Sequence, residues 1–182
     1  MARIRKFSAY QRLERPYTRI SKFTKKSFVR GGFPALKITK FDFGTPQKKF
    51  DTTIKLNVTR TMNIRQNALE SARMSSNRLL EKTIGLKAYH LRLKVFPFHV
   101  LRENPLASGA GADRMSTGMS KAYGKSIGTA ARMREGQTVL ELRIDQTNAK
   151  LGREALASAS HKLPCTCKVV VSNPERALLS PV

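Results

Sequence analysis

The sequence is poor in cysteine, in acidic residues and in long apolar stretches. Its two cysteines, Cys165 and Cys167, exclude a disulfide scaffold and are too few for an all-cysteine zinc site. This low cysteine usage favours a reducing, cytoplasmic setting. No run of about 18 apolar residues occurs, so we expect no transmembrane helix. The basic N-terminus is followed by no apolar segment, so we expect no secretory signal peptide.

The shortage of acidic residues leaves a large positive charge. The 182 residues include 35 Lys and Arg against 12 Asp and Glu, a net charge of +23. Hydrophobic residues make up 40% of the chain, so a core can form. Like charges repel in a compact chain, and a phosphate backbone relieves that repulsion. The composition therefore predicts a nucleic acid as partner. A membrane-surface helix is disfavoured, because Pro16, Gly31 and Gly32 interrupt the most basic segment.

That charge is concentrated near the N-terminus, where residues 1–50 hold 14 Lys and Arg against 2 acids. We expect residues 1–32 to form an extended basic arm that neutralises phosphates and orders on binding. Its aromatic residues have two open interpretations: they stack on bases or sugars, or they pack on the domain. The expected RNA-binding residues are Arg3, Arg5, Lys6, Arg12, Arg15, Tyr17, Arg19, Lys22, Lys25, Lys26 and Arg30, with Arg132 and Arg134 further along the chain.

Hydrophobic periodicity predicts the elements of a single body. Strands are expected within 36–43 and at 53–59, 86–96, 99–102, 129–134, 138–145 and 165–172. A helix is expected at 63–84, capped by Asn63 and ended by Gly85, and a second at 147–163, ended by Pro164. This order predicts an α+β fold, a sandwich of two helices on a mostly antiparallel sheet. The expected divisions are an arm (1–32), an RNA-binding body (33–172) and a C-terminal tail (173–182).

Residues 103–128 form a glycine-rich segment, which we interpret as a long functional loop. Its Gly124-Lys125-Ser126 run is not a P-loop, because Met119 stands where the first glycine is required. Its Gly109-Ala110-Gly111 run lacks the third glycine of a dinucleotide site, since Arg114 stands there. Asp113, beside Arg114, is interpreted as a turn former or local ion pair rather than a catalytic acid.

Catalytic and metal sites are not predicted elsewhere. The sequence has no Gly-x-Ser-x-Gly elbow and no paired carboxylates suited to acid–base work. His90, His99 and His161 are not spaced as metal ligands. Cys165 and Cys167 have His161 nearby but lack a fourth ligand, so small buried strand residues are the favoured interpretation. We therefore expect no enzyme, no metal and no cofactor.

Several motifs resemble one ribosomal family. They are the run 109–114, the step Thr117-Gly118-Met119, the run from Gly124-Lys125 to Gly128-Thr129, and the segments 15–19, 67–73 and 155–164. Over residues 12–172 the chain resembles the archaeal and eukaryotic "ten-e" large-subunit ribosomal protein, the counterpart of bacterial large-subunit protein sixteen. The sequence of these motifs is more similar to archaeal members of the family than to eukaryotic or bacterial ones.

The resemblance implies an antiparallel sheet with two helices and a structural role in the large ribosomal subunit. The implied partners are large-subunit rRNA, 5S rRNA, neighbouring ribosomal proteins and, near the peptidyl-transferase centre, the acceptor ends of A- and P-site tRNA. The implied tRNA-proximal residues are Ser108, Gly109, Gly111, Asp113, Arg114, Gly118, Lys121, Gly124 and Lys125. A free RNA-binding factor and a nucleotide-dependent enzyme are the alternative hypotheses.

Overall fold

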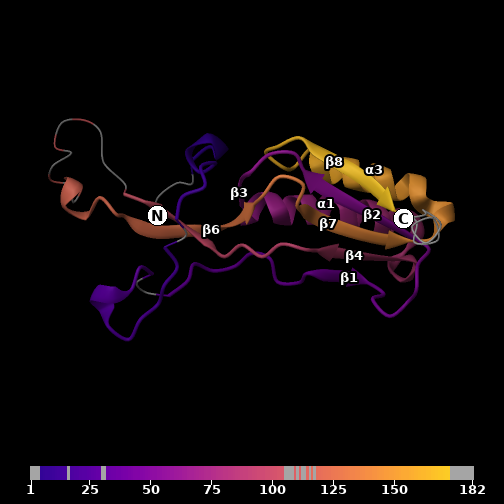
Figure 1. Ribbon diagram of the computed structural model, residues 1–182, viewed down its shortest axis with the longest axis horizontal. Helices are drawn as coiled ribbons and strands as arrows, with labels where there is room; N and C mark the ends of the chain where they lie inside the picture. The colour runs from indigo at the N-terminus through magenta and orange to yellow at the C-terminus, as the bar shows by residue number, and fades with distance from the viewer. Residues whose placement is uncertain are drawn as a thin grey trace, which may run out of the picture.

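The arrangement of the chain follows from two antiparallel sheets joined end to end. A computed structural model describes residues 5–15, 17–29, 32–104, 109, 111, 114, 116 and 118–172. Figure 1 shows an elongated molecule with a five-stranded sheet and two helices at one end and a three-stranded sheet at the other. The predicted α+β class is confirmed.

The five-stranded sheet is hydrophobic on one face. Its order is β1 (Asp42–Gly44), β4 (Tyr89–Leu93), β7 (Thr138–Ile144), β2 (Thr52–Val58) and β8 (Cys167–Ser172), and every neighbouring pair is antiparallel. Alternate residues such as Ile54, Leu56 and Leu142 are fully buried. The period-two pattern that predicted these strands therefore marks the side that carries the core.

Two helices cover that hydrophobic face. They are α1 (Gln66–Ile84) and α3 (Ala149–Ser160), the latter following a short 3₁₀ turn, η5 (Gln146–Asn148). The side chains that α1 and α3 bury are Leu69, Ala72, Ser76, Leu80, Ala155, Leu156 and Ala159. The Gly85 N–H donates to the Glu81 carbonyl at 3.2 Å with φ of 78°, which confirms the predicted end of the first helix.

The three-stranded sheet has the order β3 (Met62–Arg65), β6 (Lys125–Met133) and β5 (His99–Glu103). The chain passes between the sheets four times, from β2 to β3, from β3 through α1 to β4, from β4 to β5 and from β6 to β7. Pro97, which lacks a backbone N–H, lies in the third crossing. Backbone hydrogen bonds join the sheets where they meet, including Gly136 N to Val58 O at 2.8 Å. The strands predicted on either side of residues 135–137 thus belong to different sheets.

The first helix begins later than predicted. Asn63 is not a helix cap: it lies in β3, paired with Arg132 of β6. Arg65 is the residue before the helix and makes no capping hydrogen bond through its side chain. The expected start at residue 63 is therefore wrong, because pairing with β6 takes those residues into the sheet.

Other boundaries also differ from the predictions. The strand expected within 36–43 forms only at its end, as β1, because Ala35 and Lys37 bond to the Gln66 side chain instead. Residues 86–88 are a 3₁₀ turn, η3 (Leu86–Ala88), so the strand there starts at Tyr89. The glycine-rich segment is shorter than expected, since Glu103 belongs to β5 and Lys125 begins β6.

The second face of the five-stranded sheet is polar, and several of its charged side chains form ion pairs with one another. Glu141, 6% exposed, lies 2.9 Å from the Arg143 guanidinium and 3.4 Å from the Lys94 amine. Burial acts to raise the pKa of Glu141, but these two cations outweigh it and hold the pKa below its ordinary value. Arg92 pairs with Asp42 in the same way, at 3.4 Å. Arg92, Lys94 and Arg143 on this face therefore have carboxylate partners within the chain.

Candidate nucleic-acid interface

The basic arm crosses the three-stranded sheet, as Figure 1 shows beside β6. Its contact with β3 centres on Asn63. The Asn63 backbone N–H donates to the Gln11 carbonyl at 3.3 Å, and its side-chain Nδ2 donates to the Tyr10 and Arg12 carbonyls at 3.3 and 2.6 Å. Arg65 Nη1 donates to the Arg5 carbonyl at 2.8 Å. One strand therefore fixes the course of the arm over residues 5–12.

Tyr10 fills a small second core beneath the arm. Its ring is 8% exposed and packs with Leu101 and Ala130. Its hydroxyl donates to Glu103 Oε2 at 3.0 Å, and the same carboxylate pairs with Arg5. Burial, supported by the Glu103 carboxylate, raises the pKa of Tyr10, although the Arg5 backbone N–H opposes this shift. The Tyr10 hydroxyl thus stays protonated and bound to Glu103.

A cluster of three rings joins the second half of the arm to the base of the glycine-rich segment. Tyr17 packs edge-on against Phe28 and Tyr123, with centroids 5.3 and 5.9 Å apart. Arg102 lies 4.2 Å from the centroid of Tyr123 and donates to the Phe28 carbonyl. These contacts place arm and glycine-rich segment at the same end of the molecule.

The two interpretations of the arm aromatics apply to different residues. Tyr10 is buried, and Phe7 and Phe28 are half-buried against the body. Phe23, in contrast, is 65% exposed, and Lys26 lies 5.1 Å from its centroid. Packing therefore accounts for most of the rings, while Phe23 remains free to stack on a base.

The predicted arm cations point outward. Exposed residues are Arg5, Lys6, Arg12, Arg15, Arg19, Lys22, Lys25 and Lys26, whereas Arg3 and Arg30 lie outside the described residues. Apart from Arg5, none of these exposed cations forms an ion pair with a described residue. Such charges, held along one edge by a fixed backbone, suit the phosphates of a polyanion.

Arg132, in β6, and Arg134, directly after it, add two cations beside the arm. Both are exposed, and both line a hollow of about 650 Å³ whose other wall includes Leu13 of the arm. The structure thus brings the two predicted arginines beside the arm, although more than a hundred residues separate them in sequence.

The predicted tRNA-proximal residues lie between β5 and β6, at the end of the molecule away from the helices (Figure 1). Gly109, Gly111 and Arg114 are exposed, and the Gly118 carbonyl accepts a hydrogen bond from Asn104 Nδ2 at 3.1 Å. Lys121 closes a 3₁₀ turn, η4 (Gly118–Lys121), and Lys125 is exposed at the start of β6. Ser108 and Asp113 lie outside the described residues.

Gly124 lies where the glycine-rich segment between β5 and β6 returns to the three-stranded sheet. Its φ is 73°, and a Cβ there would lie 2.4–2.7 Å from the backbone of Glu103 and Asn104. Real Cβ atoms do not approach backbone so closely, so glycine is required for β6 to begin beside the end of β5.

Several residues of this interface were missed from the sequence. Arg65, Arg102, Glu103 and Tyr123 hold the arm in place, and Asn63 was assigned to a helix cap. Each acts on a partner distant in sequence, for example Tyr10 and Glu103, which are 93 residues apart. No local pattern signals such a pair.

Metal-ligating side chains do not gather in the part of the chain that the structure describes. No group of three or more His, Cys, Asp or Glu in this part of the chain could hold a metal ion. None of the helices in the same part is long and apolar enough to cross a bilayer. Fold and charge together define a class: a basic α+β protein whose arm and three-stranded sheet carry exposed cations that, Arg5 apart, form no ion pair among the described residues.

Comparison with known proteins narrows that class to a family. The model for ribosomal protein L16p/L10e matches residues 18–170. The large ribosomal subunit protein uL16 of Picrophilus torridus is 46% identical over 160 residues, 87% of this chain and 90% of that protein. Its namesake in Methanocella arvoryzae is 43% identical over 149 residues, covering 82% and 86%. The one in Thermoplasma acidophilum is 42% identical over 160 residues, covering 87% and 90%.

The chain belongs to the ribosomal protein L16p/L10e family. Its role is structural and ribosomal, and it is not an enzyme. The similarity predicted from the glycine-rich segment and the two helices is thereby confirmed, as is the likeness to archaeal members.

Proposed function

We propose that this chain is a structural constituent of the large subunit of cytoplasmic ribosomes. In this proposal the arm 1–32, Arg132 and Arg134 bind large-subunit and 5S rRNA. The connection between β5 and β6 extends toward the peptidyl-transferase centre and the acceptor ends of A- and P-site tRNA. Neighbouring ribosomal proteins are the other partners.

The observation that carries the proposal is the set of exposed arm cations that form no ion pair with described residues, on an arm fixed to β3 over residues 5–12. Seven of them, from Lys6 to Lys26, lack a carboxylate partner among the described residues. A net charge of +23 needs external neutralisation, and rRNA supplies it without base-specific contacts. The names of the relatives support the large subunit as the place where this occurs.

Sedimentation of native extract through a sucrose gradient at about 0.5 M salt tests the first part, because such salt strips loosely held electrostatic binders. We expect the chain in stoichiometric amount with the large subunit. Recovery mostly at the top of the gradient would instead favour a free RNA-binding factor.

The tRNA part is tested by cleavage from a tethered iron chelate. The probe is attached at Gly109→Cys in a Cys165→Ser, Cys167→Ser background, within ribosomes that carry bound tRNA. We expect cleavage at the tRNA acceptor end, and none from a matched Lys150→Cys probe on α3. Absence of tRNA cleavage from position 109 would contradict this part while leaving rRNA binding intact.

A further inference from the structure

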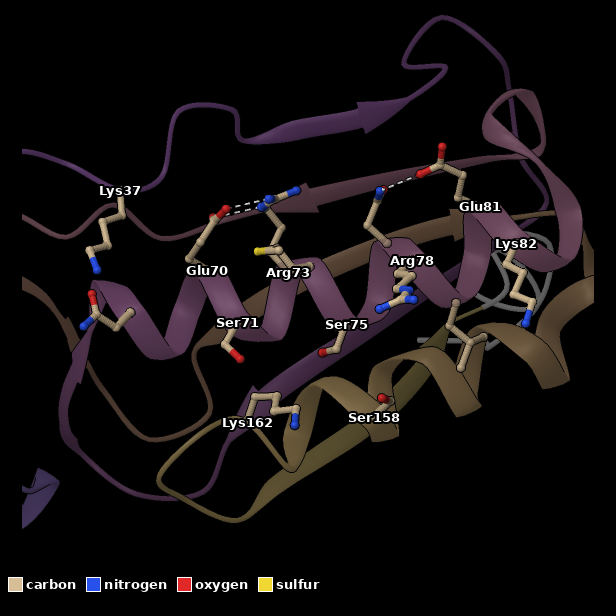
Figure 2. A pocket seen from close by; sticks show the side chains of 14 residues that line it. Lys37, Glu70, Ser71, Arg73, Ser75, Arg78, Glu81, Lys82, Ser158 and Lys162 are labelled. Carbon is tan, nitrogen blue, oxygen red and sulfur yellow. Dashed lines mark hydrogen bonds and ion pairs between the residues drawn. The ribbon is translucent and has the colours of Figure 1, made fainter.

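A second charged surface lies on the helical layer, on the side away from the sheet. Figure 2 shows a groove of about 1160 Å³ between α1 and α3. Ser71, Ser75 and Ser158 line it, so short side chains leave the space between the two helices open. The core-facing residues of α1 lie on the opposite side of that helix.

The carboxylates at this groove already have partners. Glu70 accepts two hydrogen bonds from Arg73, at 2.9 and 2.5 Å, and Glu81 accepts one from Asn77 at 3.3 Å. In Figure 2 Glu70, Arg73 and Glu81 lie along the edge of α1 away from α3. Each of these two lining carboxylates is thus engaged by a neighbour on α1 rather than by a group across the groove.

Four cations at the groove have no such partner. The side chains of Lys37, Arg78, Lys82 and Lys162 form no ion pair or hydrogen bond with any described residue. Lys82 and Lys162 lie near helix C-termini, where the helix dipole favours positive charge. That effect does not account for Arg78 in the middle of α1, nor for Lys37, which lies outside both helices.

The shape and chemistry of the groove select one kind of occupant. Among the described residues that line the groove, Met74 and Leu79 are the large apolar ones, whereas seven carry a charge. The centre of a protein–protein interface is depleted of charged residues, so this lining favours another kind of partner. Serine hydroxyls and cations are instead the groups that bind phosphate oxygens. From Ser71 to Lys82 the groove follows about 16 Å of helix, which is long enough for a few successive phosphates of one strand.

We propose that the α1–α3 groove binds the sugar–phosphate backbone of a single strand of ribosomal RNA. Lys37, Arg78, Lys82 and Lys162 neutralise successive phosphates, and Ser71 and Ser158 donate hydrogen bonds to their oxygens. This surface lies on the helical layer, away from the arm on the three-stranded sheet, so the chain would contact RNA at both ends. The inference rests on the proposed function and adds a binding site to it.

Lysine acetylation of the chain, free and within purified large subunits, gives the first test. We expect Lys82 and Lys162 to react several-fold more slowly in the subunit, and ribonuclease digestion to restore their reactivity. Equal rates in the free and assembled chain would overturn the proposal. Protection that survives digestion would also overturn it, because a protein neighbour would then fill the groove.

A charge-matched pair of variants gives the second test, with isolated large-subunit rRNA as the probe. Arg78→Gln, Lys82→Gln, Lys162→Gln is compared with Lys150→Gln, Arg153→Gln, Lys168→Gln, which removes three exposed cations outside the groove. We expect the groove variant to lower the slope of log affinity against log salt by about 2, at roughly 0.7 per lost phosphate contact. An equal loss in both variants would overturn the proposal.

The two proposals fail in distinguishable ways. If the chain does not sediment with large subunits, the ribosomal function fails. If it does sediment there while Lys82 and Lys162 react freely, only the groove proposal fails.

Discussion

The thiols of Cys165 and Cys167 differ in pKa, although the two residues are only two positions apart in sequence. Their Sγ atoms are 3.7 Å apart, and Cys167 Sγ also lies 3.6 Å from the Cys165 carbonyl oxygen. A hydrogen bond from the Cys167 thiol lowers the pKa of Cys165. The same bond, with burial adding to it, raises the pKa of Cys167. Cys165 is therefore the thiol that ionises first.

This asymmetry predicts unequal alkylation. Because the thiolate is the nucleophile, Cys165 should react with iodoacetamide faster than Cys167 near pH 8, as followed by peptide mass spectrometry. Cys167→Ala removes the donor and should slow Cys165, whereas Cys167→Ser keeps a donor and should leave its rate closer to the native one. Equal rates at the two native thiols would contradict the prediction.

His99 ties stability to pH. Burial, with Arg132 nearby, lowers its pKa from the ordinary value of 6.5, and Glu14 only partly opposes this. Between the lowered pKa and 6.5 the unfolded chain binds a proton that the folded chain does not, so the free energy of unfolding falls as pH falls through this window. Above 6.5 both states are neutral at this site and the stabilising difference is fully present.

We expect His99→Gln to flatten that pH dependence, as measured by urea unfolding between about pH 5 and 7.5, a range that spans the ordinary histidine pKa. The exposed His161→Gln is the matched control and should keep the native slope. Parallel curves for the native chain and His99→Gln would show that His99 does not carry the effect.

Among the elements, the junction of β5 with β6 depends on a single glycine. Gly124→Ala places a Cβ against the Glu103 backbone at positive φ, so we expect a loss of about 2 kcal/mol or more in unfolding free energy. Gly128→Ala, four residues along the same strand, meets no atom within 4 Å and has no positive φ. It should change stability little, and comparable losses in both variants would contradict this explanation.

The hydrogen bonds by which Asn63 of β3 fixes the arm can also be tested by mutation. Asn63→Ala removes two side-chain hydrogen bonds to arm carbonyls, which should cost about 1–3 kcal/mol. Tryptic cleavage within residues 12–26 should then accelerate. Asn67→Ala is the control, because the Asn67 side chain makes no hydrogen bond with the described residues. If both variants are cleaved at the native rate, another contact holds the arm.

Elements were predictable where one face of a strand or helix is buried along its whole length. Ile54, Leu56 and Leu142 alternate as the core requires, and Gly85 ends a helix by a local backbone conformation. The start of α1 was not predictable in this way, since Asn63 has its partners at Tyr10 and Arg12. The α1–α3 groove was not predicted either, because Arg78 and Lys162 come to line the same groove only after both helices pack on the sheet.

At the scale of the whole molecule, binding should depend on salt through the arm. Arg15, Arg19 and Lys22 are exposed and form no ion pair with described residues. Replacing all three by Gln should lower the slope of log rRNA affinity against log salt by about 2, with little effect on sequence preference. Filter binding at several salt concentrations measures it. A slope equal to that of the native chain would show that the arm does not contact phosphates.

The central strands of both sheets come from one continuous stretch, since β6 pairs with β3 and β5 while β7 pairs with β2 and β4. During synthesis, β2, β3 and β5 therefore have no sheet partner until residues 125–144 have been translated. Contacts so distant in sequence slow folding, because the chain must close long loops before they form. The two sheets should consequently appear in a single late cooperative step, and the basic arm emerges as a nascent chain well before the surface that holds it exists.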